Sequence, residues 1–506
     1  MIARKSLLIM LVEGIGGILG FVGLYFITNY MTVETLGIVG FALSFTTMFG
    51  IVKKLGFESA HIKRVSEGKD LGECIGTFIF VKLILTVIYL LVILGSLYFW
   101  TDILGRGFET DEHLIAIYIM VFYAIITSFT EIMKQTFVAR KEIAKLQIAM
   151  FVGTIFRIAA TIVIALAGQG AIELAFTYII AETVVMVVAG SFFAKFPIKK
   201  PTMPTLKSYS KFALPVVITS SIAIIITNID KVFIQLFWGA EEVGYYVAIY
   251  RLVTFLIVIE ASIGLLLFPT FSELHAKKDK KQITQLVVKS ERYLSMTAFP
   301  LVFFMVALPL PIINILLDPK YEPALPILQI LPLWALLSII SRSYGPLMLG
   351  MDRPWLATVS GVGRVVLNIV LNLILIPIDI KILGFSGFGL GATGAAIATV
   401  CTGVFGFIYL RAVAWYLIKL KWNPINMIKH FLAASAMVLV LLYITSIFEI
   451  TRWYHLILIF FAAIGIYVGI LYLIREFKKE DYNFFMDTLN PKKMLSYISE
   501  EVKGDK

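Results

Sequence analysis

Basic side chains lie within long runs of apolar residues and carry the most specific chemistry of the sequence. Arg157 and Arg364 stand 207 residues apart, each near the middle of its run. A planar guanidinium donates two parallel hydrogen bonds, so two arginines that face each other are suited to clamp a pyrophosphate. The alternative is that each arginine pairs locally with a carboxylate or a carbonyl. Arg251, Lys53 and Lys82 are the other predicted substrate-binding residues.

Two carboxylates within these runs, Asp230 and Glu13, are candidates for coupling or gating through H⁺ or Na⁺. A buried carboxylate favours a bound proton or a nearby cation. Asp230 and Arg251 flank one short loop at equal depth, roughly 12 Å along their helices, which predicts a salt bridge between them. That bridge either fixes a helical hairpin or acts as a gate. Glu13 has the alternative of pairing with a neighbouring lysine.

The sequence contains no convincing motif for binding a dinucleotide or a metal ion. "GLGATG" (Gly389–Gly394) fits the pattern G-x-G-x-x-G, but a dinucleotide site needs a preceding strand in a soluble βαβ unit. Here the glycines begin an apolar helix, where small residues allow close packing. Cys74 and Cys401 lie far apart, and the five histidines are scattered. The sequence predicts no metal site, no cofactor apart from a coupling ion, and no nucleic-acid partner.

The composition shows which elements must position these charges. Hydrophobic residues make up 59% of the 506, charged residues 15%, and the mean hydropathy is +0.91. A soluble domain averages about 25% charged residues. In lipid only helices and closed barrels satisfy every backbone group, and apolar runs of this length without alternation are helices. The predicted fold is an all-α polytopic membrane protein.

The apolar runs predict about fourteen transmembrane helices. The first resembles a signal peptide, but it carries Glu13 and lacks a small-residue cleavage site, so we expect a retained span. The fourteen predicted spans are Leu7–Met31, Leu36–Phe57, Ile75–Trp100, Leu114–Val138, Leu146–Ala167, Ala171–Ala194, Phe212–Trp238, Val243–Phe268, Tyr293–Leu317, Ala324–Leu349, Trp355–Ile378, Leu390–Ile418, Phe431–Phe448 and Trp453–Ile474.

Orientation follows from the positions of lysine and arginine. With the N-terminus inside, the loops expected outside carry only Arg106, Lys320, Lys381 and Arg452, while the inside segments carry most of the basic residues. This asymmetry predicts a multi-pass protein of the plasma (inner) membrane with both termini cytoplasmic. The basic loops and the tail also allow contact with anionic headgroups.

Basic residues close to the inner ends of the spans have a simpler interpretation. Lys53 and Lys54 either line a cavity or extend to the interface. Lys134 and Arg411 are expected to extend to the inner interface.

The chain contains an internal repeat at an offset of 207 residues. "YFITNYMTVETLGIVGFAL" (Tyr25–Leu43) aligns with "VFIQLFWGAEEVGYYVAIY" (Val232–Tyr250), and the alignment places Gly37 on Gly244. Each repeat holds six helices, so the two are parallel and related about an axis along the membrane normal. The predicted divisions are an N-terminal lobe (1–200), a C-terminal lobe (201–420), two additional helices (421–475) and a cytoplasmic tail (476–506).

The sequence resembles the Wzx-type polysaccharide biosynthesis flippases, within the superfamily of multidrug, oligosaccharidyl-lipid and polysaccharide exporters. The resemblance rests on "NIDKVFIQLFWGAEEVGYYVAIYRL", on "LNIVLNLILIPIDI" (Leu367–Ile380) and on "GATGAAIAT" (Gly391–Thr399), and it covers nearly the whole chain. The family commonly has a basic residue at the position of Arg251. The resemblance implies a non-enzymatic flippase that moves a polyprenyl- or dolichyl-phosphate- or pyrophosphate-linked oligosaccharide from the inner to the outer leaflet by alternating access. Its implied partners are that substrate and membrane lipids. The symmetric repeat allows function as a monomer, and the oligomeric state stays open.

Three alternatives stay open, and a fourth, a non-transporting scaffold, is disfavoured by the ten basic residues within the predicted spans. A cation-coupled multidrug exporter of the same superfamily has twelve spans and a more acidic cavity, which disfavours it. A peptidoglycan-precursor exporter is hardly distinguishable by sequence. From a different class, a membrane glycosyltransferase or polymerase needs a sizeable catalytic loop, whereas the loops expected outside are short.

Overall fold

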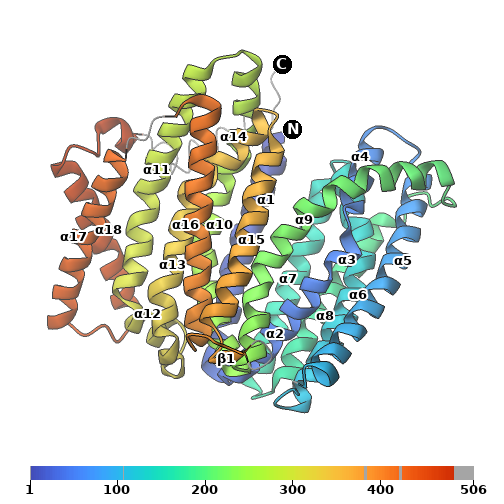
Figure 1. Ribbon diagram of the computed structural model, residues 1–506, viewed down its shortest axis with the longest axis horizontal. Coiled ribbons are helices and arrows are strands. Elements are labelled where there is room, and N and C mark those ends of the chain that lie inside the picture. Colours follow the sequence, from blue (N-terminus) through green and yellow to red (C-terminus); the bar gives the residue numbers. More distant parts are fainter. Residues whose placement is uncertain (1, 106, 381–383, 421–423, 484–506) are drawn as a thin grey trace. The chain divides into compact units, whose positions relative to one another are not determined.

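The computed structural model describes residues 2–105, 107–380, 384–420 and 424–483 (Figure 1). Long helices account for most of them, which confirms the predicted all-α class. The helices up to residue 193 are α1 (Ile2–Tyr30), α2 (Val33–Phe49), α3 (Ile51–Lys54), α4 (Phe57–Ser66), α5 (Leu71–Tyr98) with the π-helix η1 (Phe99–Ile103), α6 (Asp111–Ala139), α7 (Ile143–Leu166) and α8 (Ala171–Phe193).

The helices that follow are longer and include several breaks. They are α9 (Met203–Phe237), α10 (Ala240–Ala276), α11 (Lys280–Ala307), α12 (Pro309–Leu316), η2 (Pro319–Ala324), α13 (Leu325–Ile340), η3 (Ser341–Ser343), α14 (Tyr344–Gly350), α15 (Pro354–Leu375), α16 (Gly391–Ile418), α17 (Ile425–Ile447) and α18 (Trp453–Leu473). Between α15 and α16, strands β1 (Asp379–Ile380) and β2 (Phe385–Ser386) form a small antiparallel hairpin.

The structure supports a multi-pass membrane protein. Within the described residues, ten helices are long and apolar enough to cross a membrane, or twelve if each of two bent pairs is one span. α9 and α10 coincide with the two remaining predicted spans but fall outside this count. The figure of fourteen is therefore not confirmed, and the orientation of the termini stays a prediction.

Side-chain caps and special backbone conformations set where the helices begin and bend. Thr32 and Asp70 accept hydrogen bonds from the first turns of α2 and α5, at 3.1 and 2.8 Å, which satisfies amide groups that a helix start leaves unpaired. The axis of α2 and that of the following segment Ile51–Ser66 differ by 43°. Within that segment, between α3 and α4, Leu55 and Gly56 have left-handed φ angles of 35° and 75°. The second predicted span is thus a broken helix.

Contacts divide the chain into two units. Unit 1 comprises 1–10, 249–364 and 396–506, and unit 2 comprises 11–248 and 365–395. The core of unit 1 includes Phe271, Ile283 and Tyr344. The core of unit 2 is centred on residues such as Phe78 and Phe137. These units group residues by contact, whereas the predicted division follows the repeat, and that division stays a prediction.

A close helix crossing within unit 2 joins the two copies of the repeated segment. A Cβ added at Gly37 on α2 would overlap the carbonyl oxygen of Ala240 and lie 2.9 Å from the backbone nitrogen of Gly244 on α10. A Cβ added at Gly244 would overlap the carbonyl oxygen of Val33. Val33 and Ala240 are themselves 207 residues apart. The contact is therefore reciprocal, as two copies related by a twofold axis require.

Candidate functional site

Asp230 lies at the centre of a buried polar cluster within unit 2. Its carboxylate accepts a hydrogen bond of 2.6 Å from the Tyr246 hydroxyl and one of 2.7 Å from the Asn372 side-chain amide. The same amide donates to Asn368 Oδ1 at 3.1 Å. Helices α9, α10 and α15 thus each contribute to one cluster, which we call the Asp230 cluster.

The side chains of the Asp230 cluster are buried, and they place several oxygen atoms close together. Asp230 is 3% exposed, Asn368 1% and Asn372 0%. The Oδ1 atom of Asn372 is buried and has no hydrogen-bond partner within the described part of the chain. A buried polar atom without a partner is costly, and carboxylate and amide oxygens are ligands that hard cations prefer. The cluster therefore has the donor set of a small-cation or proton site.

Arg157 and Arg364 both keep their guanidinium groups away from carboxylates. Arg157, on α7, lies over the ring of Tyr178 with 5.4 Å between the guanidinium carbon and the ring centroid. Arg364, on α15, runs along α16 at Gly406, where an added Cβ would lie 2.9 Å from its Cδ. Its Nε atom is buried without a hydrogen-bond partner. Neither arginine forms an ion pair with any described residue.

Lys53 and Lys82 are buried within unit 2 and have partners there. The ammonium group of Lys53 donates to the carbonyl oxygen of Ala124 at 2.8 Å and lies 4.9 Å from the ring centroid of Tyr89. Lys82 is 2% exposed and pairs with Glu58 at 2.8 Å. Lys53 therefore does not extend to the interface. The predicted role of both lysines in substrate binding is untested, as is that of Arg251.

The prediction that Lys134 and Arg411 extend to the interface is wrong. Lys134 donates to Glu182 at 2.8 Å and its side chain is only 14% exposed. Arg411 forms an ion pair with Glu291 and donates to the Tyr344 hydroxyl at 2.9 Å. Both cations turn inward because a carboxylate on a neighbouring helix lies at the same depth, and pairing a buried charge is cheaper than leaving it alone.

Glu13 lies on α1 with an exposed side chain. The notion that Glu13 pairs with a neighbouring lysine stays a prediction. The role of Glu13 in coupling, like the predicted bridge between Asp230 and Arg251, stays a prediction.

Sequence reasoning missed Asn368 and Asn372 as members of the site. Both lie in the quoted motif Leu367–Ile380, four residues apart and thus on one helix face. Two amides spaced by one turn within an apolar run were the available signal. Among the described residues no group of three or more His, Cys, Asp or Glu is placed to hold a metal ion, so any cation at the Asp230 cluster needs amide or hydroxyl oxygens in addition to the Asp230 carboxylate.

More than half of the chain matches a known protein family. The family model described as polysaccharide biosynthesis protein matches residues 28–326, which include Asp230, Tyr246 and Arg157. The segment with Asn368, Asn372 and Arg364 lies beyond the matched range.

Relatives of assigned and unassigned function match the chain. An uncharacterized membrane protein of Methanocaldococcus jannaschii is 29% identical over 48% of this chain, which spans about half of that relative (47%). The probable low-salt glycan biosynthesis flippase Agl15 of Haloferax volcanii is 24% identical over 79% of this chain and 80% of its own. The teichuronic acid biosynthesis protein TuaB of Bacillus subtilis is 26% identical over 42% of this chain and 41% of its own.

Solved structures share the fold. The lipid II flippase MurJ in an inward closed conformation has a TM-score of 0.71 and 16% identity, covering 91% of this chain and 98% of its own. An inward-facing multidrug transporter of the MATE family, in the MOP superfamily, has a TM-score of 0.65 and 14% identity, covering 80% and 96%. At these identities the likeness concerns the fold alone.

Proposed function

The chain belongs to the family of polysaccharide biosynthesis proteins, and from this membership we propose that it is a flippase for a lipid-linked oligosaccharide. The cargo is an oligosaccharide joined to a polyprenyl or dolichyl carrier through a phosphate or pyrophosphate. It moves from the inner to the outer leaflet by alternating access, without covalent chemistry. Similarity to the probable glycan biosynthesis flippase of Haloferax volcanii over four fifths of both chains supports this proposal.

The observation that carries the proposal is the contrast among the basic residues in the apolar helices. Lys82, Lys134 and Arg411 each have a carboxylate partner. Arg157 and Arg364, equivalent at the repeat offset, have none within the described residues. Both arginines are half-buried; a partly buried guanidinium without a counter-ion carries a desolvation cost, and a ligand phosphate relieves it through two charge-assisted hydrogen bonds. These two arginines are the proposed phosphate ligands.

The function is tested by measuring leaflet exchange of a fluorescent polyprenyl-pyrophosphate oligosaccharide in proteoliposomes. We expect the protein to accelerate exchange well above the rate in protein-free vesicles. Transport of an amphipathic cationic drug without exchange of the oligosaccharide would assign the protein to multidrug export. Exchange of a peptidoglycan precursor alone would assign it to that cargo. Glycosyl transfer from an activated sugar, measured in the same vesicles, would contradict the assignment as a transporter.

We further propose that the Asp230 cluster couples transport to H⁺ or Na⁺. The Asp230 carboxylate accepts hydrogen bonds from Tyr246 and Asn372, and the buried Oδ1 of Asn372, which has no hydrogen-bond partner among the described residues, supplies a further oxygen. Binding of the ion neutralises the carboxylate and satisfies the amide oxygen. The hydrogen bonds from Tyr246 and Asn372 then hold the carboxylate oriented toward the ion.

Replacing Asp230 by asparagine is expected to remove the ion dependence of flipping. An interaction with a charged group is worth about 1.5–3 kcal/mol, so stimulation by the ion gradient is expected to fall by at least about tenfold. The measurement compares flipping rates with and without Na⁺ and pH gradients. Asp318→Asn, whose carboxylate lies 3.9 Å from Lys320 outside the cluster, is the matched control. An unchanged gradient response in Asp230→Asn would place coupling elsewhere.

A further inference from the structure

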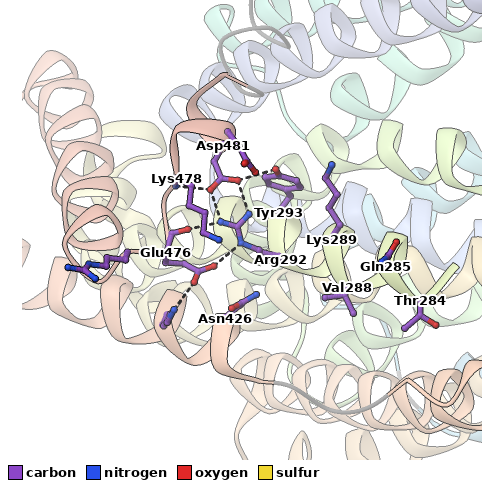
Figure 2. Close-up of a pocket in the computed structure, with 13 residues that line it drawn as sticks. Thr284, Gln285, Val288, Lys289, Arg292, Tyr293, Asn426, Glu476, Lys478 and Asp481 are labelled. Carbon is purple, nitrogen blue, oxygen red and sulfur yellow. Dashed lines mark hydrogen bonds and ion pairs between the residues drawn. The ribbon is translucent and has the colours of Figure 1, made fainter. Parts of the chain in front are cut away.

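A cavity of about 690 Å³ opens in unit 1 between α11, the start of α17 and the segment that follows α18 (Figure 2). No role has been assigned to it above. Arg292 occupies one wall, where its guanidinium donates to Glu476 at 2.8 Å and to Asp481 at 2.7 Å. Figure 2 shows these three side chains converging. Lys429 pairs with Glu476 at 2.9 Å.

The two carboxylates on this wall, those of Glu476 and Asp481, already pair with basic side chains of the protein. Burial acts against their charged forms, but the hydrogen bonds from Arg292 outweigh it and hold the pKa of both Glu476 and Asp481 below its ordinary value. Both are therefore ionised at neutral pH and neutralise Arg292 and Lys429 between them. This pairing ties the segment after α18 to α11 and leaves no spare negative charge on the wall.

The remaining basic residues of the cavity are not neutralised in this way. Lys289, Arg475 and Lys478 line it with exposed side chains, and none pairs with a carboxylate among the described residues. Glu480 is the only further acid in the lining. Three cations against one anion give the cavity a local positive charge, so its chemistry suits an anionic group.

The position of the cavity identifies the class of anion. Asn426 lies in the first turn of α17 and Arg475 follows the end of α18, so the lining marks the level at which apolar spans end. That level is where phospholipid headgroups lie, and basic side chains there gain about 1 kcal/mol each from anionic lipids. Further along α17, Ile428 and Leu432 are 49% and 57% exposed and share one face, which offers an apolar path for an acyl chain.

We propose that this cavity binds the phosphate of an anionic phospholipid headgroup, with Lys289 and Lys478 as its principal ligands. The site concerns a resident bilayer lipid and is independent of the cargo that the protein moves. Arg475 provides additional positive charge, and Glu480 opposes binding. The segment after α18, held by Arg292, forms one wall of the site.

Native mass spectrometry of the purified full-length protein tests the proposal with dioctanoyl phosphatidylglycerol as probe and dioctanoyl phosphatidylcholine as reference. We expect phosphatidylglycerol to bind more tightly. Each cation is worth about fivefold in affinity, so Lys289→Gln combined with Lys478→Gln is expected to weaken phosphatidylglycerol binding about 30-fold. Glu480→Gln is expected to strengthen it about fivefold, a gain that a purely structural role does not produce.

The controls separate this site from general surface charge. Lys280→Gln with Lys281→Gln removes two exposed lysines from the same helix outside the cavity and is expected to change binding less than twofold. Equal losses in both double variants, or equal binding of the two lipids, would overturn the proposal. Displacement of the lipid by inorganic phosphate at equal concentration would assign the site to free phosphate. No cargo is present, so these outcomes do not depend on the proposed flippase activity.

Discussion

Flipping of the oligosaccharide carrier is expected to fall at least about 100-fold when Arg157 and Arg364 are both replaced by alanine. A hydrogen bond to a charged group contributes about 1.5–3 kcal/mol, so loss of two such ligands costs about 3–6 kcal/mol, which corresponds to at least two orders of magnitude in binding. The rate is measured in proteoliposomes with a fluorescent polyprenyl-pyrophosphate oligosaccharide at a concentration below saturation. Each single variant is expected to retain part of the activity.

Two controls define what the double variant tests. Arg353→Ala with Arg452→Ala removes the same charge from exposed positions outside the apolar helices and is expected to leave flipping unchanged. Arg157→Lys with Arg364→Lys keeps the charge but not the planar fork that binds phosphate bidentately, and intermediate rates are expected. Flipping that survives in the double alanine variant would retain the function and exclude these arginines as phosphate ligands.

The thermal stability of the protein is expected to drop sharply in Gly37→Ala. The added methyl group overlaps backbone atoms of Ala240 and Gly244, and backbone cannot move aside as a flexible side chain can. Overpacking of this kind costs about 1–3 kcal/mol or more. Unfolding of the purified protein in detergent, followed by tryptophan fluorescence, measures the change. Gly244→Ala is expected to have the same direction of effect because it meets Val33 in the equivalent way.

Gly190→Ala is the matched control for the crossing. Gly190 also lies within an apolar helix, α8, but a Cβ there meets no described atom within 4 Å. Alanine is a better helix former than glycine by up to about 1 kcal/mol, so this variant is expected to be as stable as the parent or more stable. Equal unfolding temperatures for Gly37→Ala and Gly190→Ala would contradict the close crossing. Combining Gly37→Ala with Gly244→Ala is expected to cost less than the sum, because either change opens the same contact.

The helices were predictable because each apolar run has the length of a transmembrane helix, and burial in lipid enforces helical hydrogen bonding. The breaks were not. The interruption between α3 and α4 has left-handed backbone at Leu55 as well as Gly56, and leucine carries no sequence signal for that conformation. The 82° bend between α11 and α12 lies beside Pro309. A count of apolar residues does not distinguish this proline from its neighbours, so it does not predict the bend.

The site was predictable only where charge or the repeat marked it. Asp230, Arg157 and Arg364 stand out as ionisable residues in apolar runs. Asn368 and Asn372 carry no charge, and their meeting with Asp230 depends on helix rotation, which hydropathy does not define. The carboxylate partners of Arg411 and Arg292 lie 120 and at least 184 residues away along the chain. Such pairs follow from tertiary packing, so no local pattern indicates them.

The reciprocal crossing of α2 and α10 has a consequence for the origin of the chain. Gly37 against Ala240 and Gly244 against Val33 are one contact made twice, since each partner is the other's counterpart 207 residues away. An interface of this kind is self-complementary, so two separate copies of one ancestral segment already contain the residues that form this contact. A dimer of half-length proteins could thus have preceded the gene fusion, with the covalent link later freeing the two halves to acquire different side chains, such as Asp230 in one and Gly23 at the equivalent position in the other.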